Sequence, residues 1–213
     1  MSFINKLRSH LSFLKFRKVE KSRDLADRQE FLEIYKLLLA ERPAVRGLKT
    51  FVETGTFQGE NIRKLEPYFD VLYTIEIDPK LHAEAKAKHP SLKIHYVLGD
   101  SSVELRKISE EIQQPALFYL DAHFSGEGTG RGSKDVPLIE EMEILRKRNQ
   151  PDCIIVDDLR LFGTHRNQED WSAVTRNSIL QAFGAQDLQI FEQGDKLILL
   201  RSPESHPGHP KYL

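Results

Sequence analysis

The feature that most constrains the fold is a regular alternation of short apolar runs and longer amphipathic stretches from Lys49 onward. The runs are rich in β-branched and aromatic residues, and they predict strands near residues 50–54, 71–77, 93–98, 116–121 and 152–157. The stretches between them predict helices near residues 59–69, 79–88, 101–113, 137–148 and 170–183. Because parallel strands need a crossover connection, this alternation indicates a doubly wound α/β domain with helices on both faces of the sheet.

The end of the chain has a different pattern. Apolar runs at residues 188–192 and 196–200 flank Gln193-Gly194-Asp195, a sequence typical of a hairpin turn. We therefore expect a mostly parallel, seven-stranded sheet that ends in an antiparallel C-terminal hairpin. Proline and glycine recur in residues 203–213, which predicts a flexible tail, so the main domain is expected to span residues 48–202.

Residues 1–47 are expected to form an N-terminal helical extension. Apolar residues recur at helical spacing over residues 3–14, and basic side chains are frequent up to residue 23. A second helix is predicted over residues 24–41, ending before Pro43. The basic helix would lie on an anionic membrane surface, bind a partner, or dock on its own domain or on a second copy of the chain, which would make a homodimer.

Composition excludes several classes of protein. The formal net charge is −1 at pH 7, and no Asn/Asp-Pro-Pro-Tyr/Phe segment for a flipped base is present, so nucleic acid is not an expected partner. The only cysteine, Cys153, allows neither an intramolecular disulfide nor a cysteine zinc cluster. No apolar stretch is long enough to cross a bilayer, and charged residues interrupt the position of a signal-peptide core. A cytoplasmic location is therefore expected.

Acidic residues end the first three predicted strands, where ligands bind in an open α/β sheet. A glycine turn follows the first strand, and its expected ligand contacts are Glu53, Thr54, Gly55, Thr56, Phe57 and Gly59. Glu76, followed by Ile77, ends the second strand at a spacing that suits a ribose diol. Asp100, followed by Ser101, would accept a hydrogen bond from an adenine amino group. These positions predict a nucleoside pocket.

The glycine turn also distinguishes between nucleoside ligands. It lacks the G-x-G-x-x-G pattern of dinucleotide sites, and the Glu53 carboxylate would repel a pyrophosphate but attract the ammonium group of a methionine moiety. On these residues, the chain from about Thr50 to Arg201 resembles the class I S-adenosylmethionine-dependent methyltransferases. The resemblance implies a Rossmann-like fold and S-adenosylmethionine as cofactor. Residues 120–126 and 156–162 are similar to a little-characterised branch of that superfamily.

Three more acids follow the fourth and fifth predicted strands, namely Asp121, Asp157 and Asp158. Carboxylates in one crevice repel each other unless a cation joins them, and hard oxygen ligands suit Mg²⁺, or else Mn²⁺ or Ca²⁺. The layout is similar to that of metal-dependent O-methyltransferases, although the catechol type has Asp-Asn where this chain has Asp157-Asp158. The alternative is that Arg160 pairs with one aspartate while another caps the following segment.

His123 lies two residues after Asp121, and both are candidate catalytic residues. Imidazole titrates near neutral pH, so His123 is a candidate general base, with a fourth metal ligand as its other role. Asp121 is also expected to contact the donor, and His165 is a weaker candidate base. Residues 125–134 alternate glycine with polar side chains and predict a lid over the reaction centre, with a plain flexible loop as the alternative.

Together these features predict an enzyme that transfers a methyl group from S-adenosylmethionine to an oxygen of a small molecule or saccharide, assisted by a metal ion. The alternative is a non-catalytic, methyltransferase-like module that binds the donor and is tethered to a membrane or partner by the basic N-terminal helix. A nicotinamide or nucleotide-sugar protein is disfavoured by the charge of Glu53.

Overall fold

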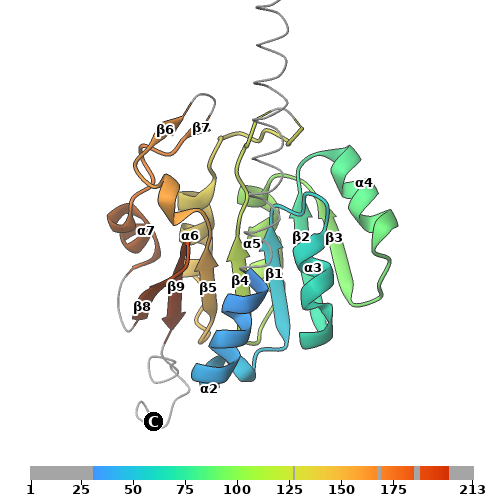
Figure 1. The fold of residues 1–213 in the computed structure, drawn as a ribbon, viewed down its shortest axis with the longest axis horizontal. Coiled ribbons are helices and arrows are strands. Elements are labelled where there is room, and N and C mark those ends of the chain that lie inside the picture. The colour runs from blue at the N-terminus through green and yellow to red at the C-terminus, as the bar shows by residue number, and fades with distance from the viewer. Residues whose placement is uncertain (1–30, 127, 167–168, 185–187, 202–213) are drawn as a thin grey trace, which may run out of the picture.

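The computed structural model describes residues 31–126, 128–166, 169–184 and 188–201. Seven strands form one sheet in the order β3-β2-β1-β4-β5-β9-β8 (Figure 1). Their bounds are β1 Thr50–Thr54, β2 Val71–Glu76, β3 Ile94–Leu98, β4 Ala116–Leu120, β5 Cys153–Val156, β8 Leu188–Gln193 and β9 Lys196–Arg201. Strands β1 to β5 are all parallel to one another, and β9 is antiparallel to both β5 and β8. The predicted doubly wound sheet with an antiparallel C-terminal hairpin is confirmed.

Helices cover both faces of this sheet. In Figure 1, α2 and α3 lie in front of the sheet, and α5 and α6 lie behind it. The helices are α2 Pro43–Arg46, α3 Glu60–Leu65, α4 Pro79–Lys88, α5 Ser101–Glu111, α6 Leu138–Arg146 and α7 Arg176–Phe183, and residues 31–41 are also helical. Short 3₁₀ turns occupy Glu66–Tyr68 and Leu159–Leu161, and β6 (His165–Arg166) pairs with β7 (Glu169–Asp170). None of the described helices is both long and apolar enough to span a bilayer.

Two helices differ most from their predicted bounds. The helix predicted over 170–183 begins at Arg176, because Thr175 forms a capping box: its Oγ1 accepts a hydrogen bond from the Ser178 N–H at 3.0 Å, and its N–H donates to Ser178 Oγ at 2.8 Å. The helix predicted over 59–69 ends at Leu65 and continues as a 3₁₀ turn that contains Pro67. Of the residues predicted to form the second N-terminal helix, 31–41 are described and are helical.

The apolar core has one layer on each face of the sheet. Side chains of α5, α6 and α7 fill the first layer, and those of helix 31–41, α2 and α3 fill the second. Phe31 belongs to the second layer, where its ring stacks on Tyr119 of β4 with 3.9 Å between centroids. Residues 31–47 thus cover one face of the sheet. The predicted domain boundary at residue 48 stays a prediction, and residues 1–30 and 202–213 lie outside the described residues.

Strand order reverses between β1 and β4, which both end at the upper edge of the sheet in Figure 1. In open α/β sheets this reversal creates the crevice in which ligands bind. The neighbouring strand β5 begins with Cys153, which is buried, and burial raises the pKa of its thiol. The functional candidates therefore belong to the loops that leave the carboxyl ends of β1 to β5.

Candidate functional site

The glycine turn after β1 is packed against the loop that leaves β4. Gly55 has φ +85°, and a Cβ atom at this position would lie 2.6 Å from the carbonyl oxygen of Asp121. Thr54 is fully buried, and its Oγ1 accepts a hydrogen bond from the Asp121 N–H at 3.2 Å. Glycine is therefore required where two loops of the crevice meet. Gly59, with φ +71°, precedes the first residue of α3.

The acids that end β1 and β2 are buried and hold this turn. Glu76 accepts hydrogen bonds from the N–H groups of Phe57 at 2.7 Å and Asp78 at 2.9 Å. Glu53 accepts one from Thr74 Oγ1 at 2.8 Å, and that hydroxyl lies 2.6 Å from Thr56 Oγ1. The residues predicted to contact a donor are thus brought together at one end of the sheet, and their role toward a ligand stays a prediction.

Asp100 ends the loop after β3 and caps α5. Its Oδ1 accepts hydrogen bonds from Ser102 N–H at 3.0 Å and Ser102 Oγ at 2.7 Å. Its Oδ2 accepts two more from Ser133, from N–H at 3.0 Å and from Oγ at 3.1 Å. Although burial acts in the other direction, these hydrogen bonds lower the pKa of Asp100 below its ordinary value. Ser101, the first residue of α5, is buried beside it.

Residues 128–134, here called the strap, lie against the carboxyl ends of β2 and β3. A Cβ atom at Gly130 would lie 2.3 Å from Ile77 Cγ2, and one at Gly132 would lie 2.9 Å from Asp100 Oδ2. Arg131 pairs with Asp135 at 2.7 Å. The segment predicted to cover the reaction centre therefore packs on two residues that the sequence assigned to the adenosine end of the donor.

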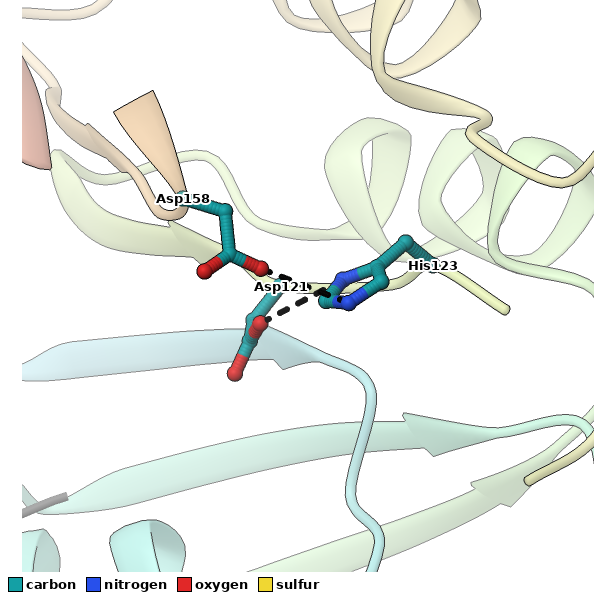
Figure 2. Close-up of side chains that lie close together, drawn as sticks. All are labelled: Asp121, His123 and Asp158. Atoms are coloured by element: carbon teal, nitrogen blue, oxygen red, sulfur yellow. Dashed lines mark ion pairs between the residues drawn. The ribbon is translucent and has the colours of Figure 1, made fainter. Parts of the chain in front are cut away.

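Asp121, His123 and Asp158 lie together beyond β4 and β5. His123 Nε2 is 3.3 Å from Asp158 Oδ2, and His123 Nδ1 is 3.7 Å from Asp121 Oδ1. Figure 2 shows both carboxylates on the same side of the imidazole. One ligand atom from each residue lies within 4.8 Å of the other two, which is compatible with a shared metal ion. Ser125 Oγ at 2.7 Å from Nε2 and the Trp171 ring, 5.2 Å between centroids, also contact the imidazole.

The third predicted metal ligand, Asp157, has other partners. Its carboxylate pairs with Lys196 Nζ at 2.6 Å, and it accepts hydrogen bonds from Tyr119 and from the Asp158 N–H, the latter at 2.7 Å. Lys196 is 0% exposed. Among the described residues, Asp121, Asp157 and Asp158 do not form a group with ligand atoms within 4.8 Å of one another, whereas the trio with His123 does. Asp157 as a ligand stays a prediction.

Arg160 forms ion pairs with Asp158 and Asp195, so the alternative of an arginine partner for one aspartate is found in the structure. Asp121 lacks such a partner among the described residues. Burial, together with Asp157 and Asp158, raises the pKa of Asp121 well above its ordinary value, although Lys196 acts in the opposite direction. His165, the weaker candidate base, has a side chain that is 73% exposed and lies beside Asp170.

Sequence reasoning missed Glu141, which is 0% exposed. It lines a small cavity of about 10 Å³ together with Asp121, His123, Asp158 and Trp171. Burial raises the pKa of Glu141 to about 7. In the sequence, Glu140-Glu141 is typical of a solvated helix face, and only the apolar residues around the pair indicate that one of the two points inward.

Searches among solved structures find proteins with the same architecture. Magnesium protoporphyrin IX methyltransferase from Synechocystis, with bound SAH, is 14% identical with a TM-score of 0.56, over 90% of this chain and 95% of that chain. The N-methyltransferase NodS from Bradyrhizobium japonicum is 14% identical with a TM-score of 0.53, over 83% and 98%. SAM-bound CalS10, an amino pentose methyltransferase from Micromonospora echinaspora, is 12% identical with a TM-score of 0.53, over 88% and 96%. The chain has the class I methyltransferase fold.

No protein-family model and no curated protein matches the sequence. The three structures carry acceptors of different chemistry in their names, so the methyltransferase fold does not by itself identify an acceptor. Within this fold, Glu53, Glu76 and Asp100 lie at the ends of β1, β2 and β3, whereas Asp121 and Asp158 follow β4 and β5. The carboxylates therefore lie on both sides of the point where the strand order reverses, after β1 to β3 on one side and after β4 and β5 on the other.

Proposed function

We propose that this protein transfers a methyl group from S-adenosylmethionine to a hydroxyl oxygen of a small molecule or saccharide. The observation that carries the proposal is the row of carboxylates at adjoining strand ends, on a fold shared with methyltransferases. Glu76 and Asp100 would bind the ribose and adenine of the donor, and Glu53 would attract its methionine ammonium group. Thr54, Gly55 and Thr56 would line the methionine end, where the close packing of Gly55 on Asp121 leaves no room for a side chain.

The side of the crevice that follows β4 and β5, here called the acceptor half, would supply the groups that act on the acceptor hydroxyl. His123 would accept the proton of the acceptor hydroxyl as the methyl group leaves sulfur, and Asp121 would orient the imidazole and stabilise its charge. The sulfur–carbon bond breaks as the oxygen–carbon bond forms, and S-adenosylhomocysteine leaves with the sulfur electron pair. Alignment of donor and acceptor in one crevice would provide much of the rate enhancement.

Carboxylate and imidazole ligands beside the acceptor half fit a divalent cation, for which Mg²⁺ is the ion predicted from the sequence. Such an ion would lower the pKa of an acceptor hydroxyl that it binds. Asp121 and Asp158 are the oxygen ligands that their positions support best, with Asp157 as the further predicted ligand. Asp121 forms no ion pair with a lysine or arginine among the described residues, which supports a cation at this place.

Calorimetric titration of the full chain with S-adenosylmethionine tests the donor. We expect micromolar binding, and Glu76→Gln should weaken it by about 10- to 100-fold because a charged hydrogen-bond acceptor is lost. Glu84→Gln, at an exposed position of α4, is the matched control and should leave binding unchanged. Folded protein that binds no donor would refute the proposal.

Transfer of labelled methyl groups tests the acceptor half separately. His123→Ala should retain donor binding and lose about 10²- to 10⁴-fold in transfer rate. A screen that compares phenols, sugars and amines as acceptors should give labelled ethers; labelled amines only would contradict oxygen as the target atom.

A donor-binding module without catalysis is the second candidate function. Donor binding without transfer to any class of acceptor would support this candidate.

A further inference from the structure

Glu141 is a buried acid without a partner. Neither carboxylate oxygen has a hydrogen bond among the described residues, although the hydroxyls of Ser101 and Thr54 are near enough to lower its pKa. Leaving a buried carboxylate unpaired is costly, and such groups occur in native proteins where a ligand, an ion or a water satisfies them. Glu141 lines the same small cavity as Asp121, His123 and Asp158, so an occupant of that cavity is the natural partner.

The charges around the cavity are unbalanced. Asp157 pairs with Lys196, and Asp158 shares Arg160 with Asp195. The described residues provide neither a lysine nor an arginine partner for Asp121 or Glu141. Two carboxylates thus remain, and one divalent cation would neutralise both.

The geometry of the trio offers a place for that cation. Asp121, His123 and Asp158 provide three ligand atoms within 4.8 Å of one another (Figure 2). Glu141 is not part of this group, so its carboxylate would reach the cation through a water molecule.

We propose that the cavity binds a divalent first-row transition-metal ion through Asp121, His123 and Asp158, with Glu141 holding a water ligand of the ion and Asp157 outside the ligand set. The proposal deepens the cation-assisted part of the proposed function and rests on it, with His123 as a ligand of the ion in place of its role as general base. It does not require methyl transfer. The sequence predicts Asp121, Asp157 and Asp158 as ligands, with His123 as an alternative fourth ligand and Mg²⁺, Mn²⁺ or Ca²⁺ as the ion. The proposal leaves Asp157 out of that set, makes His123 a ligand and adds Glu141.

The imidazole decides the preferred ion. Mg²⁺ favours oxygen ligands and an octahedral shell rich in water, whereas imidazole nitrogen suits first-row transition metals. Contacts with Ser125 and with the Trp171 ring hold the His123 ring beside the carboxylates. Its Nδ1 faces Asp121, and its Nε2 is shared by Ser125 and Asp158. Asp157 does not join the trio: its ligand atom groups with those of Asp158 and Asp195 instead, and Lys196 and Tyr119 already contact its oxygens.

The proposal can be tested without donor or acceptor by titrating the metal-free full chain with Mn²⁺. Binding is measured as the decrease in the electron paramagnetic resonance signal of the free ion. We expect one Mn²⁺ per chain, and Mg²⁺ should compete at least about tenfold more weakly because of the imidazole ligand. His123→Ala should weaken Mn²⁺ binding by at least about 100-fold. Glu141→Gln should weaken it by about 10- to 100-fold, the usual effect of removing a group that supports a metal ligand.

Glu143→Gln, at an exposed position of the same helix, is the matched control and should leave Mn²⁺ affinity unchanged. Asp157→Asn should change the affinity by less than Asp158→Asn does, and circular dichroism checks that each variant is folded. Folded wild-type protein that binds no Mn²⁺, or Glu141→Gln with wild-type affinity, would overturn the proposal. Failure here would leave donor binding untouched, since that titration is made without Mn²⁺.

Discussion

Of two buried ionisable side chains near the crevice, Lys196 has a partner of opposite charge and Glu141 does not. Lys196 is fully buried at the start of β9 and pairs with Asp157, which Tyr119 also contacts. Removal of one partner of such a pair leaves an uncompensated charge in the interior. We therefore expect Lys196→Met to lower the free energy of unfolding by about 3–5 kcal/mol, measured by urea denaturation. The double variant with Asp157→Asn should recover part of that loss, and a single-variant loss below about 1 kcal/mol would mean that water reaches the pair.

Glu141 lacks such compensation and should destabilise the metal-free protein at neutral pH. Burial raises its pKa from 4.5 to about 7, so the folded chain holds the proton more tightly than the unfolded chain. Stability is then fully present below pH 4.5 and is lost as the pH rises toward 7. We expect Glu141→Gln to raise the free energy of unfolding at pH 8 by roughly 3 kcal/mol and to have no effect near pH 4. Thermal melts with a chelator across this pH range test the difference, which a pH-independent effect would contradict.

At the scale of elements, the strap packs closely on the sheet edge because Gly130 and Gly132 have no side chains there. Gly130 lies so close to Ile77 that a Cβ atom would clash at 2.3 Å, and its φ is not in the left-handed region. Gly130→Ala should therefore detach the strap by steric overlap alone, while the sheet and both core layers stay intact. We expect amide hydrogen exchange to rise at least about tenfold across residues 128–134, with little change in global stability. Gly47→Ala, where a Cβ meets no atom within 4 Å, is the control, and unchanged exchange in Gly130→Ala would contradict the contact.

At the scale of the whole molecule, the helix over residues 31–41 belongs to the core that covers one face of the sheet. Phe31, Tyr35 and Leu38 are each 3% exposed or less. A chain that begins at residue 48 would expose this apolar face, so we expect it to bind a hydrophobic dye and to unfold without cooperativity. Phe31→Ala in the full chain should cost about 3–5 kcal/mol. If residues 48–213 alone unfold cooperatively, with the same thermal midpoint as the full-length chain, the boundary predicted from the sequence would be supported instead.

Periodicity was sufficient to predict the sheet, because buried parallel strands such as Cys153-Ile154-Ile155-Val156 need nearly continuous apolar runs. The glycine turn was recognisable because Gly55 is required by close backbone approach. Other features depend on contacts between distant segments and leave no local pattern. Ser133 meets Asp100 across 33 positions, and Lys196 meets Asp157 across 39. The start of α7 was missed for a local reason, since the cap formed by Thr175 outweighs the helical periodicity before it.

The position of Cys153 has a practical consequence for experiments on this protein. The chain has a single thiol, which is buried within β5 and has a raised pKa, so alkylating reagents reach it only when the sheet opens. The rate at which Cys153 is alkylated therefore reports how often the native chain opens globally. A second cysteine introduced at the exposed Ser133 would react far faster, so a fluorophore could be attached to the strap without replacing the native residue.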